Sequence, residues 1–144
     1  MTVDDVLALD RQVCFALAVA SRSVIAVYRP LLEPLQLTHP QYLVMLALWE
    51  RSPRSVKDLS GALRLDPATL SPLLKRLEAL GHCTRRRSPD DERMLTVELT
   101  GAGRELRAEA EKIPPAVMDR LGMDVAELAE LHRVLTRVIA ATDA

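Results

Sequence analysis

Two cysteines, Cys14 and Cys83, are the side chains of this sequence with the greatest capacity for covalent chemistry. They show no C-x-x-C spacing, and two thiols are too few for a disulfide framework or a four-ligand zinc site. As a thiolate, a cysteine is a nucleophile open to oxidation, whereas a buried cysteine behaves as a small apolar side chain. Each cysteine therefore has to be judged by its surroundings.

No other set of side chains has the spacing of a catalytic or metal-binding site. The sequence contains no serine, histidine and aspartate set, no metal-ligand spacing and no phosphate-binding glycine loop. The three histidines are isolated from one another: His39, His82 and His132. We therefore expect no catalytic residue, no metal and no cofactor.

The composition suits one compact globular domain over residues 1–144, with 49% hydrophobic and 27% charged residues. The net charge is only −1, but it is unevenly distributed. Residues 51–88 hold nine Lys and Arg against three Asp and Glu, whereas residues 89–144 hold seven against twelve. A basic centre beside an acidic flank favours a module that contacts phosphate groups, and chance clustering on a solvated face is the alternative.

The sequence gives no sign of membrane insertion or export. No apolar run approaches the roughly 20 residues of a spanning helix, and Met1–Asp5 lacks a basic start. We expect a cytoplasmic protein that makes no membrane contact.

Cys14 falls within the first expected helix. Apolar residues recur every three or four positions from residue 6 to about residue 28, and Pro30 then ends or bends the helix. A capping box of Thr38 and Gln41 predicts a second helix, which runs to about residue 51.

The basic centre has the pattern of a helix-turn-helix followed by a hairpin. Ser55 caps a short helix to residue 63, and Asp66 begins another that stops at Gly81. Alternating apolar residues up to Thr100 then indicate a β-hairpin.

Two helices are expected after the hairpin, one to about residue 112 and one capped by Asp124, with Pro114 and Pro115 between them. The fold class is therefore mainly α, an α+β winged helix-turn-helix between long helical arms.

The second helix of a helix-turn-helix enters the major groove with its N-terminal half. If the leucines of this helix face the core, helical spacing turns a small polar set and a basic set outward, namely Thr69, Ser71, Pro72, Lys75 and Arg76. The hairpin adds Arg86, Asp91 and Arg93 to the candidate DNA-binding residues. Arginine near a hairpin tip enters narrow minor grooves, and a carboxylate beside it, from Asp91 or Glu92, would hold Arg93 extended.

These elements resemble the winged helix-turn-helix of the MarR family of bacterial transcription regulators. The resemblance is carried by residues 66–71, by residues 74–78 and by the Asp90–Arg93 wing, and the order of elements extends it to about residues 10–139.

The MarR resemblance implies an obligate homodimer that binds a palindromic operator in double-stranded DNA. In that case residues 1–36 and 101–144 form a helical dimerisation region, and residues 37–100 form the DNA-binding region. The aliphatic stripe of the last helix independently favours a partner.

Three further segments resemble the OhrR-type organic hydroperoxide sensors of that family: residues 11–15, 28–32 and 38–43. This resemblance implies that Cys14 is the redox-sensing thiol and that Tyr28 hydrogen-bonds it. Tyr42 is retained, either as a further thiol-bonding candidate or as a core side chain only. His39 stands where the family has a tyrosine that also bonds the sulfur, so it either donates in that tyrosine's place or only caps its helix.

A hydrogen bond between Cys14 and Tyr28 has to cross between two chains. The two residues lie 14 positions apart on one expected helix, or roughly 21 Å at 1.5 Å per residue. The sensor and the dimer interface would then be one structure.

The leading hypothesis is a homodimeric repressor that releases its operator when an organic hydroperoxide, the inducer, oxidises Cys14. Cys83 opens a wing strand and does not match the family's resolving cysteine. Oxidised Cys14 would therefore form a mixed disulfide with a small cellular thiol, or overoxidise. The alternatives are a MarR-type repressor that responds to a small aromatic ligand, and a thiol peroxidase.

Overall fold

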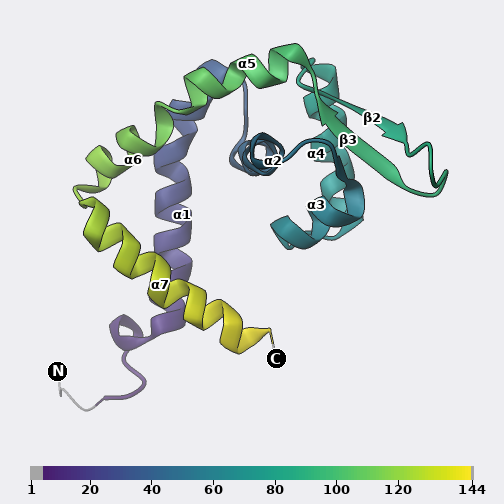
Figure 1. Ribbon diagram of the computed structural model, residues 1–144. Coiled ribbons are helices and arrows are strands. Elements are labelled where there is room, and N and C mark those ends of the chain that lie inside the picture. The colour runs from purple at the N-terminus through teal and green to yellow at the C-terminus, as the bar shows by residue number, and fades with distance from the viewer. Residues whose placement is uncertain (1–4, 144) are drawn as a thin grey trace.

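The computed structural model describes residues 5–143, a mostly helical chain with one small sheet (Figure 1). In chain order its elements are η1 (Leu9–Arg11), α1 (Val13–Leu32), η2 (Glu33–Leu35), α2 (His39–Glu50), β1 (Arg54–Ser55), α3 (Val56–Leu63), α4 (Pro67–Ala79), β2 (Cys83–Arg87), β3 (Leu95–Leu99), α5 (Gly101–Ala110), α6 (Ile113–Leu121) and α7 (Val125–Thr142). The mainly α, winged helix-turn-helix fold expected from the sequence is confirmed.

Side-chain caps set the start of five helices. In α2, α3, α4, α5 and α7 the N-cap oxygen accepts a hydrogen bond from a first-turn backbone N–H, at Thr38, Ser55, Asp66, Thr100 and Asp124 respectively. Each cap satisfies a donor that the helix leaves without an internal partner. The capping box of Thr38 and Gln41 is present in full, as the sequence predicts.

The wing is a β-hairpin extended by a third, very short strand. The strand order is β1-β3-β2, and both pairings are antiparallel. Cys83 pairs with Leu99 in the hairpin, and Arg54 of β1 pairs with Val97. β1 was not predicted, because two residues are too few to show an alternating pattern.

The hydrophobic core lies in the winged helix-turn-helix. Leu70, Leu74 and Leu77 of α4 are fully buried, and Leu73 and Leu80 pack against the same core, which confirms the predicted inward face of this helix. α2, α3 and the wing supply the other walls, with Val44, Met45, Leu48, Leu59 and Val97 among the fully buried side chains.

The remaining helices form an extended arm. α5 and α6 run in an arch from the wing to α1, and α7 then turns back toward α3 (Figure 1). α7 has no buried residue, and Leu32 is the one buried residue of α1. The arm therefore leaves apolar side chains uncovered within a single chain.

The first helix begins later than the sequence predicts. α1 starts at Val13, because Gln12 is extended and its side-chain amide donates to the carbonyl oxygens of Val6 and Ala8 at 2.8 and 3.1 Å. Pro30 lies in the last turn of α1 and does not end the helix, which continues to Leu32.

The expectation of two helices after the hairpin is wrong, because residues 101–143 form three. Pro114 and Pro115 do not merely separate helices but lie in the first turn of α6. A proline is tolerated there because its missing N–H would have no intrahelical acceptor.

The expectation that no apolar segment approaches a spanning length also needs correction. The stretch Val13–Leu35, 23 residues long, is long and apolar enough by length and composition to cross a membrane. Arg22 and Arg29 interrupt it, which hides it from a search for uninterrupted apolar runs. A helix that packs on a partner chain satisfies the same criteria.

Candidate nucleic-acid interface and thiol site

The outward face of α4 carries the side chains predicted to contact DNA. Thr69, Pro72, Lys75 and Arg76 are exposed, and Ser71 is half-buried. The helix begins at Asp66, whose carboxylate accepts the Thr69 backbone N–H at 2.7 Å. That hydrogen bond lowers the pKa of Asp66.

The wing positions its arginines differently from one another. Arg86 is exposed and donates to the Glu98 carboxylate at 3.0 Å, whereas Arg85 donates to Glu78 at 2.5 Å and so ties the wing to α4. At the tip, Asp91 accepts the backbone N–H of Arg93 at 3.0 Å. Among the described residues no ion pair joins Asp91 to the Arg93 guanidinium. In the free chain the Asp91 carboxylate therefore shapes the turn, and its expected effect on the Arg93 side chain stays a prediction.

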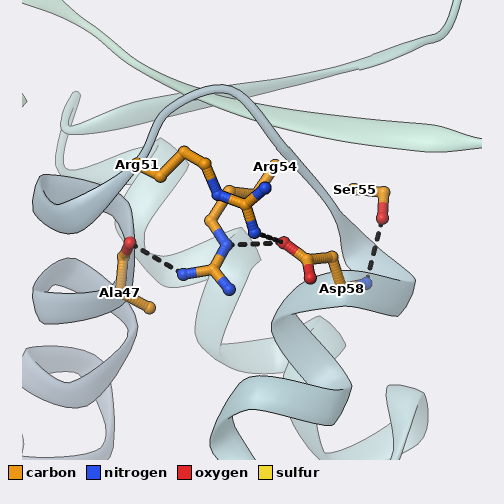
Figure 2. A network of polar contacts seen from close by, with 5 residues as sticks. All are labelled: Ala47, Arg51, Arg54, Ser55 and Asp58. Atoms are coloured by element: carbon orange, nitrogen blue, oxygen red, sulfur yellow. Dashed lines mark hydrogen bonds and ion pairs between the residues drawn. The ribbon is translucent and has the colours of Figure 1, made fainter.

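A buried arginine connects the end of α2 to the start of α3 (Figure 2). Arg54 is 8% exposed, and it donates to the Ala47 carbonyl at 3.1 Å and to the Asp58 carboxylate at 2.7 Å. The exposed Arg51 donates to the same carboxylate oxygen at 2.8 Å. The hydrogen bond from Arg54 is the main cause of the lowered pKa of Asp58. Sequence reasoning missed this network, because no local pattern distinguishes Arg54 from its solvated neighbours.

Cys14 lies in the first turn of α1 and is exposed in the single chain. Tyr28 lies near the other end of the same continuous helix. One chain therefore cannot bring this thiol and this phenol together.

Three polar rings form a cluster where α1 meets α2. The Tyr28 ring lies 5.1 Å from the His39 ring and 5.8 Å from the Tyr42 ring, and the latter two lie 6.4 Å apart, between centroids. The structure thus brings together the three predicted thiol-bonding side chains and places Cys14 elsewhere in the same chain.

Burial determines the protonation of this cluster. It raises the pKa of Tyr28 and Tyr42, and the Tyr28 charge raises that of Tyr42 further. Burial also lowers the pKa of His39. Near neutral pH the cluster therefore offers two phenolic O–H donors and an uncharged imidazole.

Cys83 is a core residue of β2, at 1% exposed. Burial, with a further contribution from Glu78, raises the pKa of this thiol to about 11. A thiol with so little thiolate at neutral pH is a poor nucleophile. No group of three or more metal-ligating side chains occurs within residues 5–143.

A wing and an exposed basic helix on one compact core define this chain as a winged-helix DNA-binding regulator. The profile of a family described as transcriptional regulator SarA/Rot matches residues 26–110. The chain belongs to this family of MarR-like transcriptional regulators, so it is a regulator and not an enzyme. The thiol-peroxidase alternative is thereby removed.

Two relatives have sequences similar to this chain. The organic hydroperoxide resistance transcriptional regulator of Bacillus subtilis is 40% identical over 131 residues, which cover 91% of this chain and 89% of that one. The HTH-type transcriptional regulator TtmR of Methylorubrum extorquens is 46% identical over 124 residues, or 86% of this chain. This chain spans only 64% of the length of TtmR.

Solved structures of AbfR, a protein of Staphylococcus epidermidis, are similar in fold. Reduced AbfR bound to DNA superposes with a TM-score of 0.81 and 32% identity, covering 94% of this chain and 92% of AbfR. The disulfide-formed state of AbfR superposes less closely, with a TM-score of 0.66.

Proposed function

We propose that this regulator is a homodimeric repressor that binds a palindromic operator while Cys14 is reduced and releases it after an organic hydroperoxide oxidises that sulfur. The observation that carries the proposal is the cluster of Tyr28, His39 and Tyr42. Its member Tyr28 shares helix α1 with Cys14, an exposed thiol that the cluster cannot reach within the chain. The function of the Bacillus subtilis relative supports the choice of oxidant.

A second copy of the chain is the partner that the exposed arm needs. Apolar side chains remain exposed along α1 and α7, among them Val13, Phe15, Val19, Leu131, Val134, Val138 and Ile139. A two-fold interface would cover these faces in both copies at once. The proposed dimerisation region comprises residues 1–36 and 101–144.

The same two-fold pairing would complete the sensor. With α1 of each copy antiparallel to its counterpart, Cys14 of one chain approaches the ring cluster of the other. The phenols of Tyr28 and Tyr42 keep their protons and would donate to the sulfur, and His39 adds a third polar ring beside them. Each dimer would then hold two sensors, both built across the interface.

The chemistry is a two-electron oxidation of sulfur. The Cys14 thiolate attacks the outer oxygen of the hydroperoxide, an S–O bond forms, the O–O bond breaks, and the alkoxide leaves and takes up a proton as the alcohol. The sulfenic acid that results presents different hydrogen-bonding atoms to Tyr28 than a thiolate does. A small cellular thiol then condenses with it to a mixed disulfide.

Helix α2 would carry this change to the DNA-binding residues. His39 and Tyr42 occupy its first turns, and the carbonyl of Ala47 near its other end accepts a hydrogen bond from Arg54. Arg54 also bonds Asp58 in the first turn of α3. A shift of α2 would therefore move the helix-turn-helix with it.

The proposed DNA-binding residues would contact different parts of the operator. Thr69, Ser71 and Pro72 at the N-terminal half of α4 would meet base edges, and Lys75 and Arg76 would contact phosphates. Arg86, Asp91 and Arg93 place the wing beside the minor groove. Two such units in a dimer suit half-sites about one helical turn apart. Operator binding places the protein with the DNA in the cytoplasm.

The test is operator binding before and after oxidation. A duplex palindrome would first be selected from a random pool by the reduced protein. Wild type, Cys14→Ser and the matched control Cys83→Ser would then be titrated with it, with and without one equivalent of cumene hydroperoxide. We expect release by wild type and by Cys83→Ser, retention by Cys14→Ser, and recovery after dithiothreitol.

Two results would contradict the proposal. Continued binding by oxidised wild type would exclude Cys14 as the switch and leave a repressor with another inducer, such as a small aromatic ligand. A monomer by sedimentation at binding concentrations would exclude a sensor built across two chains.

A further inference from the structure

A cavity with charged walls lies beside the ring cluster. It has a volume of about 320 Å³ and lies between the last turns of α1 and the start of α2. Its charged and polar lining comes from Arg29, Glu33, Thr38 and His39, and its apolar lining from Ile25, Leu37 and Pro40. The volume suits the head group of a small polar molecule.

The charges of this cavity are not used within the chain. Arg29 and Glu33 are one helical turn apart, yet neither takes part in an ion pair among the described residues. The Thr38 hydroxyl accepts the Gln41 N–H at 3.4 Å, so its own proton is left to donate. A cation, an anion and a hydroxyl donor thus line one hollow.

His39 connects this cavity to the proposed sensor. Its imidazole lines the cavity and also lies 5.1 Å from the Tyr28 ring, between centroids. A group attached to a sulfur at the ring cluster would therefore have the cavity as its neighbour.

We propose that this cavity binds the amino-acid head group of the small thiol that forms the mixed disulfide with Cys14. Arg29 and Thr38 would bind the α-carboxylate, and Glu33 would bind the α-ammonium group. This inference rests on the proposed function, since the thiol reaches the cavity only if the partner's Cys14 lies at the ring cluster.

The step that the cavity assists is a condensation. The thiol sulfur attacks the sulfenic sulfur of Cys14, an S–S bond forms, the S–O bond breaks, and the hydroxyl leaves as water with the thiol proton. The thiol sulfur is oxidised and the sulfenic sulfur is reduced, so no further oxidant is required. Binding the head group orders the incoming thiol and raises the rate.

The experiment uses thiols that carry one charge of the head group at a time. Full-length protein would be oxidised with one equivalent of cumene hydroperoxide and mixed with cysteine, cysteamine or 3-mercaptopropionate, and the mixed disulfide would be timed by intact-protein mass spectrometry. The proteins are wild type, Arg29→Gln, Glu33→Gln and the control Lys57→Ala, an exposed residue of α3. The rate with each thiol is compared among the four proteins, so that differences in intrinsic reactivity between the thiols do not enter the comparison.

We expect a pattern that follows charge. Arg29→Gln would lower the rate of mixed-disulfide formation with cysteine and with 3-mercaptopropionate by about tenfold and leave the rate with cysteamine unchanged. Glu33→Gln would lower the rate with cysteine and with cysteamine and leave the rate with 3-mercaptopropionate unchanged. Lys57→Ala would match wild type with all three thiols.

Rates that each variant changes equally for all three thiols, or not at all, would overturn the head-group site. The sulfenic acid would be trapped separately with dimedone. If it forms normally in both variants, such a result concerns the cavity alone. If no dimedone adduct forms at Cys14 even in wild type, the proposed sensing function fails and the inference fails with it.

Discussion

Arg64 and Asp143 form a two-pronged ion pair that joins the helix-turn-helix to the end of the last helix. The guanidinium Nη1 and Nη2 atoms each lie 2.7 Å from a different carboxylate oxygen of Asp143. Arg64 ends α3 with a left-handed φ of 55°, and Asp143 directly follows α7. The pair raises the pKa of Arg64 and lowers that of Asp143. Because α7 has no buried residue within the chain, this contact connects it directly to the DNA-binding half.

Breaking this pair should weaken operator binding without unfolding the protein. We expect Arg64→Ala and Asp143→Asn each to lower the affinity for the operator by about two- to fivefold at low salt. The loss is small, and smaller still at high salt, because both side chains are solvent-exposed and salt screens their attraction. Fluorescence anisotropy at two salt concentrations measures this. The charge exchange Arg64→Asp with Asp143→Arg should restore affinity, and additive losses in that double variant would contradict a direct contact.

A methyl group at Gly103 should destabilise the whole winged helix. A Cβ there would lie 2.1 Å from the His82 carbonyl oxygen, and the Gly103 carbonyl itself accepts the Trp49 indole N–H at 2.8 Å. We expect Gly103→Ala to lower the free energy of unfolding by about 3 kcal/mol, as overpacking against backbone does. Urea unfolding followed by fluorescence of the single tryptophan measures it.

Gly61 provides the matched control for this substitution. It lies within α3, and an added Cβ meets no atom within 4 Å. Gly61→Ala should therefore stabilise the protein by up to about 1 kcal/mol through helix propensity. Equal losses in both variants would show that the predicted contact with His82 is not the cause.

Substitutions of Arg54 and Arg51 should differ sharply in their effect on the free energy of unfolding, although both side chains donate to the same oxygen of Asp58. Arg54→Ala removes a buried side chain and leaves the Ala47 carbonyl without its donor, so we expect a loss of about 2 kcal/mol in the free energy of unfolding. Arg51→Ala should change it by less than about 0.5 kcal/mol, because that arginine is exposed. Thermal and urea unfolding compare the two, and similar losses would contradict the role given to burial.

Lowering the pH should destabilise the protein over a pH range that is determined by the pKa values of two histidines. Burial lowers the pKa of His39 and His82 in the folded chain below the value of about 6.5 that histidine has when unfolded. Above that value both states are neutral and the stability is complete. As the pH falls below it, the unfolded chain binds protons first and the folded state loses stability.

Urea unfolding at pH 7.5 and pH 5.5 measures this dependence. The loss should be smaller in His39→Gln and in His82→Gln than in wild type. Carboxylates with lowered pKa, such as Asp58 and Asp66, act in a separate window below about pH 4. A stability that stays constant from pH 7.5 to 5.5 would contradict the burial of these two imidazoles.

The basic residues of α4 should govern the salt dependence of operator binding. We expect Lys75→Ala and Arg76→Ala each to weaken binding and to reduce the slope of log K against log salt by about 1, since each removes one phosphate contact. Lys112→Ala, between α5 and α6, serves as the control and should leave the slope unchanged. Unchanged slopes in both α4 variants would place the phosphate contacts elsewhere.

The sequence by itself determined the local features of this protein. Capping side chains such as Thr38 and Asp66 accept hydrogen bonds from backbone N–H groups three residues further along the chain. The two strands of the hairpin are close in the sequence, and their alternating apolar residues pair across it. The inward face of α4 follows from helical spacing alone. Such short-range patterns predicted the winged helix, and its family resemblance is confirmed.

Tertiary structure decided what depends on contacts between distant segments. It placed Tyr28, His39 and Tyr42 in one cluster, buried Arg54 beside Asp58, and paired Arg64 with Asp143. Nothing in the local sequence distinguishes these side chains from solvated ones, because their environment is created only when the chain folds and the partners meet.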